Sequence, residues 1–118
     1  MIAHVVLFRP RADLSAQARQ ALTASFEAAL TRIPSIRRAR VGRRVVAGRP
    51  YDALMRVDYQ YAAVIEFDDR AGLMAYLEHP SHEQLAARFY GAFEEALMYD
   101  FELHEGVAGL ASLLTDTQ

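Results

Sequence analysis

The sequence predicts an α+β subunit of the ferredoxin-like class, with the element order β-α-β-β-α-β and one antiparallel sheet. Two observations carry this prediction: period-2 alternation marks four short strands, and apolar stripes at helical spacing mark the helices between them. A chain of 118 residues that is 53% apolar fits one folded domain. We predict a domain over 1–103 and a C-terminal extension over 104–118.

The first two elements are a central strand and a long helix. Apolar residues occupy both faces of Ile2–Phe8, which is typical of a strand in the middle of a sheet. The spacing predicts a helix over Ser15–Ile33 that Asp13 or Ser15 can cap. Pro34 then ends it.

The middle of the chain predicts two strands joined by a loop. In Ile36–Val46, three apolar residues alternate with arginines, the pattern of a strand with one wet face. The stretch Ala47–Val57 contains Gly48 and Pro50 and predicts a loop. Tyr59–Phe67 predicts the third strand.

The last third predicts a broken helix and a final strand. Asp69 can cap a short helix that runs through Leu77 and ends at Pro80. The segment Ser81-His82-Glu83-Gln84 has the pattern of a capping box, and the helix after it turns Leu85, Phe89, Phe93 and Leu97 inward. Leu97–Leu103 predicts the fourth strand. The tail after His104 either docks against the body or a partner, or frays.

With the helices on one face of the sheet, the other face would point apolar side chains to water. These are Ala3, Val5, Leu7, Val64, Tyr99 and Phe101. A contiguous apolar patch of that kind marks an interface. We therefore predict a homodimer through the open sheet face.

Composition narrows the class of protein. The chain has no cysteine, which excludes disulfides and thiolate metal sites. It shows neither a signal-peptide pattern nor an apolar run of about 18 residues, so a cytoplasmic protein without membrane contact is expected. The net charge of −2 disfavours nucleic-acid binding. Frequent alanine, with arginine as the only strong base, indicates a GC-rich, bacterial coding sequence.

Two histidines, His79 and His82, flank a proline between two helices, with Tyr76 just upstream. Enolisation or aldol chemistry needs a base to remove a proton next to a carbonyl, and a donor for the oxyanion that forms. A histidine suits the first role and a tyrosine hydroxyl the second. His4 lies on a strand face with apolar neighbours and would enter the same space. The alternative is structural: a helix-start histidine, a half-buried tyrosine and a core histidine.

Three other groups have simpler interpretations. His79 with His82 would need a third ligand to hold a metal, so we predict no metal site and a helix-end role for His79. An arginine cluster is interpreted as a solvated edge-strand face. Tyr59 and Tyr61 would either line the mouth of a ligand pocket or pack in the dimer interface. Packing is favoured for an aromatic pair on a strand, and Tyr61 is the better ligand contact. The arginine cluster comprises Arg37, Arg38, Arg40, Arg43, Arg44 and Arg49.

An ordered set of short motifs carries a family resemblance. The set comprises Met1–Phe8, Ile33-Pro34-Ser35-Ile36, Val41-Gly42, Glu66-Phe67-Asp68-Asp69, Tyr76-Leu77-Glu78-His79-Pro80-Ser81-His82 and Asp100-Phe101-Glu102. Over residues 1–103 the chain resembles the dimeric α/β-barrel, stress-responsive (Dabb) family. The resemblance implies a dimer whose two sheets form a barrel, and a pocket between sheet and helices.

Some members of that family are similar to polyketide cyclases, in which a tyrosine and the second histidine of His-Pro-x-His carry an aldol-type ring closure. By position these are Tyr76 and His82, and His4 matches a pocket-lining position. Phe26 stands where those cyclases have a tyrosine, so one polar group is missing. The expected ligand-binding residues are His4, Val6, Phe26, Tyr61, Ala63, Ile65 and Phe89.

Two classes of function follow. In the first, the dimer binds a small carbonyl or aromatic compound, polyketide-like by resemblance, and cyclises or enolises it without a cofactor, with His82 as base, Tyr76 as donor and His4 orienting the ligand. Cofactor-independent oxidation, as in a monooxygenase, would use the same pocket. In the second, the protein is a non-enzymatic stress-response dimer that sequesters a small molecule or serves as a structural module.

Overall fold

The computed structural model describes residues 1–115 and confirms the ferredoxin-like class. The elements in chain order are β1 (Ile2–Pro10), α1 (Ala16–Arg32), β2 (Arg38–Arg43), α2 (Pro50–Leu54), β3 (Tyr61–Phe67), α3 (Arg70–Glu78), α4 (Pro80–Ala92), β4 (Phe93–Glu102) and α5 (Gly106–Thr115).

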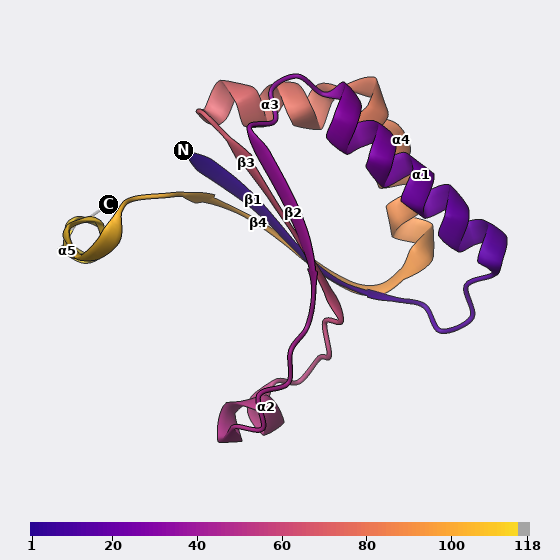
Figure 1. Cartoon of the computed structure of the whole chain (residues 1–118), viewed down its shortest axis with the longest axis horizontal. Coiled ribbons are helices and arrows are strands. Elements are labelled where there is room, and N and C mark those ends of the chain that lie inside the picture. The colour runs from indigo at the N-terminus through magenta and orange to yellow at the C-terminus, as the bar shows by residue number, and fades with distance from the viewer. Residues whose placement is uncertain (116–118) are drawn as a thin grey trace.

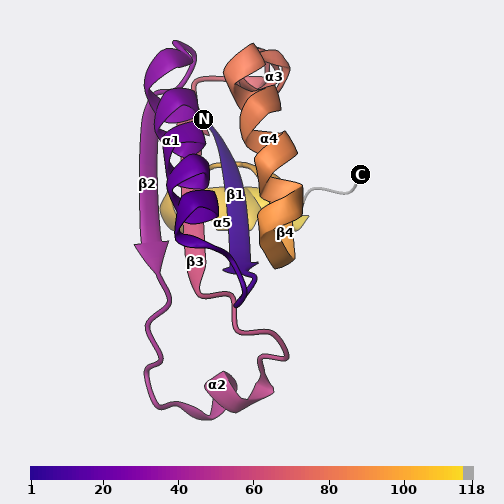
Figure 2. The ribbon, with the colours of Figure 1, turned by 90° about the vertical axis from the view of Figure 1, so that its right-hand side faces the viewer.

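One antiparallel sheet has the strand order β2-β3-β1-β4, so β1 is central as predicted. Helices α1, α3 and α4 cover one face (Figure 1). The short helix α2 hangs beyond one end of the sheet, and α5 lies on the side away from the helix layer (Figure 2). Within residues 1–115, no layer of helices covers the other sheet face.

Two helix starts follow the predicted capping chemistry and one does not. Ser15 accepts a hydrogen bond from the Ala18 amide, and Asp69 accepts one from Gly72. The predicted capping box at Ser81 is wrong, because His79 caps α4: its Nδ1 accepts a hydrogen bond from the Ser81 amide at 3.0 Å. Pro80 takes the first helical position, where its missing N–H costs nothing.

Strand boundaries differ from prediction where pairing overrides local pattern. The fourth strand begins at Phe93, because 93–102 pairs with β1, and the predicted helix therefore stops at Ala92. The third strand begins at Tyr61 instead of Tyr59, and the second spans only 38–43. The stretch predicted as a loop over 47–57 contains α2, for which Pro50 is a favourable first residue.

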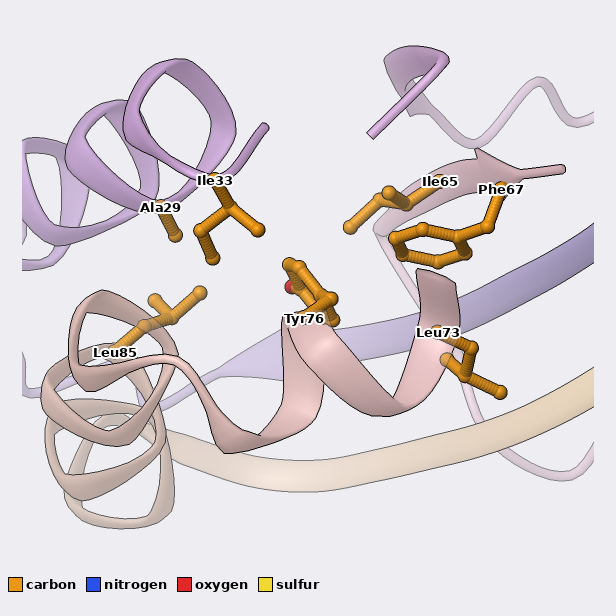
Figure 3. Close-up of a cluster of buried hydrophobic side chains, with 7 residues drawn as sticks. All are labelled: Ala29, Ile33, Ile65, Phe67, Leu73, Tyr76 and Leu85. Atoms are coloured by element: carbon orange, nitrogen blue, oxygen red, sulfur yellow. The ribbon is translucent and has the colours of Figure 1, made fainter. Parts of the chain in front are cut away.

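The main core forms where α1, α3 and α4 meet β3 (Figure 3). Phe67 and Tyr76 are its largest side chains, and their ring centroids lie 5.3 Å apart. A second cluster around Val6, Ala63 and Phe89 adds an aromatic group that includes Phe8 and Phe26. Fully burying a side chain of this size contributes about 1.5–3 kcal/mol. The main cluster is Ala29, Ile33, Ile65, Phe67, Leu73, Tyr76 and Leu85.

Both core clusters pack on β1 and β3, so the β2 edge is left uncovered. All six residues of β2 are exposed, including Ala39 and Val41, which were expected on a covered face. The arginines here lie on a solvated edge as predicted. Arg37 pairs with Asp68 at 2.7 Å, and each holds the other's pKa away from its usual value: the arginine's raised, the aspartate's lowered.

The open sheet face keeps large apolar side chains in water. Tyr99 is 58% and Phe101 50% exposed, with ring centroids 6.3 Å apart. Ala3 was expected to point to water as well but is buried, because its short side chain lies between Glu66 and Phe101 on the flanking strands. Within residues 1–115, no helix is long and apolar enough to cross a membrane.

Candidate functional site

A small cavity lies beside the His79–His82 junction, between the helix layer and strands β1 and β4. Its volume is about 50 Å³. Strand β1 contributes His4 and Val6, the end of α3 contributes Tyr76, and α4 contributes His82 and Phe89. The family motif and the start of the chain, far apart in sequence, therefore meet at one place.

The three polar side chains of the sequence hypothesis surround this cavity together. The Tyr76 ring centroid lies 4.6 Å from that of His82 and 5.7 Å from that of His4. Tyr76 packs into the main core on its other side (Figure 3). The proline junction brings this about, since it ends α3 just after Tyr76 and starts α4 so that His82 falls in its first turn.

His4 is held by a carboxylate that the sequence hypothesis missed. Asp100 lies directly opposite His4 in the pairing of β1 with β4, and its Oδ1 is 2.6 Å from His4 Nδ1. Because a carboxylate only accepts, Nδ1 carries a proton, and in the neutral ring Nε2 is left as an acceptor. His4 is buried while Asp100 is exposed on one side.

His82 is oriented in the same way by the backbone. Its Nδ1 lies 3.1 Å from the Leu77 carbonyl oxygen, and since a carbonyl only accepts, Nδ1 is the protonated nitrogen. Burial lowers the pKa of His82, and the nearby His4 lowers it further. His82 is therefore neutral at pH 7, with Nε2 free to take up a proton.

Tyr76 has the opposite character. It is almost completely buried, and this burial raises its pKa to about 12. Its hydroxyl therefore stays protonated at physiological pH and can donate a hydrogen bond. The site thus pairs a neutral imidazole base with a neutral phenol donor, which is the division of roles that proton abstraction beside a carbonyl requires.

The two histidines of the junction have different roles. His79 Nδ1 accepts the hydrogen bond that caps α4, so its protonated nitrogen in the neutral ring is Nε2, the reverse of His82. In the part of the chain that the structure describes, no three His, Asp or Glu side chains come together as a metal site would need.

Comparison with known proteins identifies the family. The model of the stress responsive A/B barrel domain, Dabb, matches residues 2–103. The chain belongs to the Dabb family. No curated protein sequence matches it significantly.

Solved structures share the Dabb fold at low identity. A dimeric protein of unknown function with a ferredoxin-like fold from Bacteroides fragilis is 25% identical, with a TM-score of 0.60 over 86% of this chain and 95% of that chain. Hydroxynitrile lyase from Passiflora edulis is 17% identical, with a TM-score of 0.73 over 89% and 94%. SnoaB, a cofactor-independent oxygenase from Streptomyces nogalater, is 14% identical, with a TM-score of 0.62 over 90% and 95%.

Several predicted ligand-binding residues of this Dabb protein lie away from the cavity. Ala63 and Ile65 are sealed in the core, at 1% exposure each, and Phe26 packs beside them. Tyr61 stacks on Phe8 and lines a separate groove on the open sheet face. All four lie on β3 or α1, whereas the cavity is lined from β1, α3, α4 and β4, and periodicity alone could not show which elements would line it.

The structure adds Met98 and Tyr90 to the cavity and Asp100 to its polar network. Asp100 and Met98 lie on the helix-facing side of β4, two residues apart. The motif Asp100-Phe101-Glu102 was a signal for Asp100, and pairing the first strand with the last would have placed it beside His4. Met98 and Tyr90 are both exposed and line the cavity from β4 and α4.

The Asp100→Ala variant is expected to release the His4 ring. Without the carboxylate, nothing holds the proton on Nδ1, and the tautomer with Nε2 protonated becomes populated. Nitrogen-15 NMR of the imidazoles measures this directly, and the chain has only four histidines to assign. His79, whose Nδ1 accepts a hydrogen bond from the Ser81 amide, serves as the internal control and should not change. An unchanged His4 tautomer would mean that Asp100 does not orient the ring.

Proposed function

We propose that this Dabb protein is a homodimer that binds a small carbonyl compound at the 50 Å³ cavity and promotes proton transfer next to the carbonyl. The observation that carries the proposal is the pairing at the cavity wall: a histidine kept neutral by burial and a tyrosine kept protonated by burial, with rings 4.6 Å apart. Like the cyclisation expected by resemblance, this reaction begins with an enolate.

The proposed step uses only groups of the chain. His82 Nε2 takes a proton from the carbon beside the carbonyl, and the electrons of that C–H bond form the carbon–carbon double bond of an enolate. Negative charge develops on the carbonyl oxygen, where the Tyr76 hydroxyl donates a hydrogen bond. His4, oriented by Asp100, accepts a hydrogen bond from a hydroxyl of the ligand and fixes its position. Reprotonation of the carbon by His82 completes the reaction; alternatively the enolate attacks a second carbonyl, whose oxygen then takes the proton from His82.

The cavity restricts the size of the reacting group. A cavity of roughly 150 Å³ takes up a benzene ring, and the volume here is about 50 Å³. A whole aromatic ring therefore does not fit unless side chains move. We expect the carbonyl end of the ligand to enter and the remainder to lie against Tyr90 and Met98. A methionine side chain adapts to irregular shapes, so Met98 suits a cavity entrance that contacts the outer part of a ligand.

Deuterium exchange into a small ketone tests the reaction without knowledge of the substrate. In D₂O, the wild type should accelerate loss of the methyl proton signal of acetone. We expect His82→Gln to reduce the protein-dependent rate by about 10²- to 10⁴-fold, the usual contribution of a general base. Tyr76→Phe keeps the packed ring and should cost about 10²-fold.

His79→Asn is the matched control, because asparagine preserves the helix cap while removing an imidazole three residues from His82. The pH profile is a second check. Since the pKa of His82 is lowered, the exchange rate should hold as pH falls through about 6.5, the ordinary histidine value, and drop only below it. If the wild type exchanges no faster than buffer, the enzymatic proposal fails.

The second candidate, non-enzymatic binding, is favoured by the small size of the same cavity. It predicts that a carbonyl ligand shifts the NMR signals of His4 and His82 but that no exchange occurs. Under this candidate, His82→Gln and Tyr76→Phe change affinity without any effect on a rate.

A further inference from the structure

The segment 44–60, here called the arm, connects β2 to β3 and projects beyond the sheet (Figures 1 and 2). Apolar side chains on it lie more than half in water. They are Val45, Val46, Tyr51, Leu54 and Met55. The Dabb barrel itself needs only a turn to join two antiparallel strands, so the arm's apolar surface requires another explanation.

The arm is held in shape by its own polar groups. Arg44 bonds Asp58 at 2.7 Å, its amide donates to the Gln60 carbonyl at 2.8 Å, and Asp52 accepts a hydrogen bond from the Arg49 amide at 2.9 Å. These contacts close the base of the arm and start α2. The contacts that hold the arm in shape are therefore polar, and its apolar side chains remain exposed and available to a partner.

Between the arm and the open sheet face lies a groove of about 600 Å³. Leu54, Met55 and Val57 form the arm side, and Leu7 and Leu97 form the sheet side. The sheet side continues along the same strands to Val5 and Tyr99, since Leu7 pairs with Leu97 and Val5 with Tyr99. Groove and open face are thus one continuous apolar surface.

We infer that the arm is a clasp that packs against a second copy of this chain. The inference rests on the proposed homodimer. A second subunit that covers the open sheet face would also contact the groove, because the groove and the open face are one continuous surface. In a two-fold dimer each arm contributes to the same interface, so every apolar contact it makes is formed twice. The groove walls carry Arg43 and Arg56 beside this apolar lining, the arrangement of an apolar centre with a polar rim.

The Met55→Asp variant tests the clasp, with Met74→Asp as its matched control. Met55 lies on the arm and Met74 on α3 in the helix layer, and both are exposed in the subunit. Met55→Asp should raise the dimer dissociation constant about tenfold or more, because two carboxylates would be buried per dimer. Met74→Asp should change it by less than about twofold. Sedimentation velocity over a concentration series measures both.

A single thiol supplies a second readout that does not depend on a destabilising charge. Since the chain has no cysteine, Met55→Cys and Met74→Cys can each be labelled uniquely with an environment-sensitive dye. Dilution through the dissociation constant should expose the dye at position 55 to water and leave that at position 74 unchanged. If the wild type is monomeric at every concentration, the proposed homodimer itself is wrong. If the wild type is a dimer, but Met55→Asp leaves its dissociation constant unchanged and dilution leaves the dye at position 55 unchanged, only the clasp is overturned.

Discussion

Replacing Phe67 with alanine is expected to lower the free energy of unfolding by about 3–5 kcal/mol, the usual range for removing a fully buried phenylalanine. Phe67 is completely buried on β3, packs on Tyr76, and lies so near α3 that a Cβ at Gly72 would come within 3.3 Å of the Phe67 Cβ. An alanine there leaves a cavity between sheet and α3 that this dense junction cannot close. Urea unfolding monitored by circular dichroism measures the loss.

The control for this variant is Tyr90→Ala, which removes an aromatic ring that is 71% exposed. It should change stability by about 0.5 kcal/mol or less. All proteins must be compared at one concentration, because the stability of a dimer depends on mass action. A loss for Phe67→Ala no greater than that of the control would show that the core around β3 is looser than described.

Replacing Tyr99 with glutamate should dissociate the proposed homodimer, raising its dissociation constant about 100-fold or more, the effect of losing a central aromatic contact. Tyr99 stands on the open sheet face beside Phe101, and a charge there would be buried without a partner, once in each subunit. Light scattering after size-exclusion chromatography at micromolar concentration distinguishes monomer from dimer.

Tyr90→Glu is the matched control, since Tyr90 is also exposed, at 71% against 58% for Tyr99, but lies on α4 in the helix layer. It should leave the dimer intact. If both variants stay dimeric, the subunits associate through another surface. If Tyr99→Glu loses its secondary structure as well, the milder Tyr99→Ser tests the same contact without a charge.

Site residues could be predicted from sequence where the signal for them is local, and could not where it depends on a residue far away in the chain. His82, Tyr76 and His4 were found because a proline, a capping pattern and strand alternation are local features. Asp100 was missed as a polar group because its role depends on facing His4, a residue 96 positions away in sequence, across two paired strands. Ala63 and Ile65 were placed in the pocket because a strand face does not show which part of it a helix seals.

The same limit explains the errors in the fold. Residues 93–96 continue the helical spacing of Leu85 and Phe89, yet they form a strand because they pair with the end of β1, across a bulge at Arg9 and Pro10. His79 caps α4 although Ser81 has the better local pattern, because Pro80 already occupies the first helical position. In both places a neighbour in space, or a covalent restriction, outweighs propensity.

The sequence by itself determined the ferredoxin-like order, the one-sided helix layer and the apolar open face, because alternation and helical spacing state which side of each element avoids water. It also placed two histidines and a tyrosine at one junction. Only the tertiary structure decided that Asp100 orients His4, that the cavity is about 50 Å³, and that the arm and open face form one surface. These depend on strand register and on the volume left between packed layers, which no local pattern encodes.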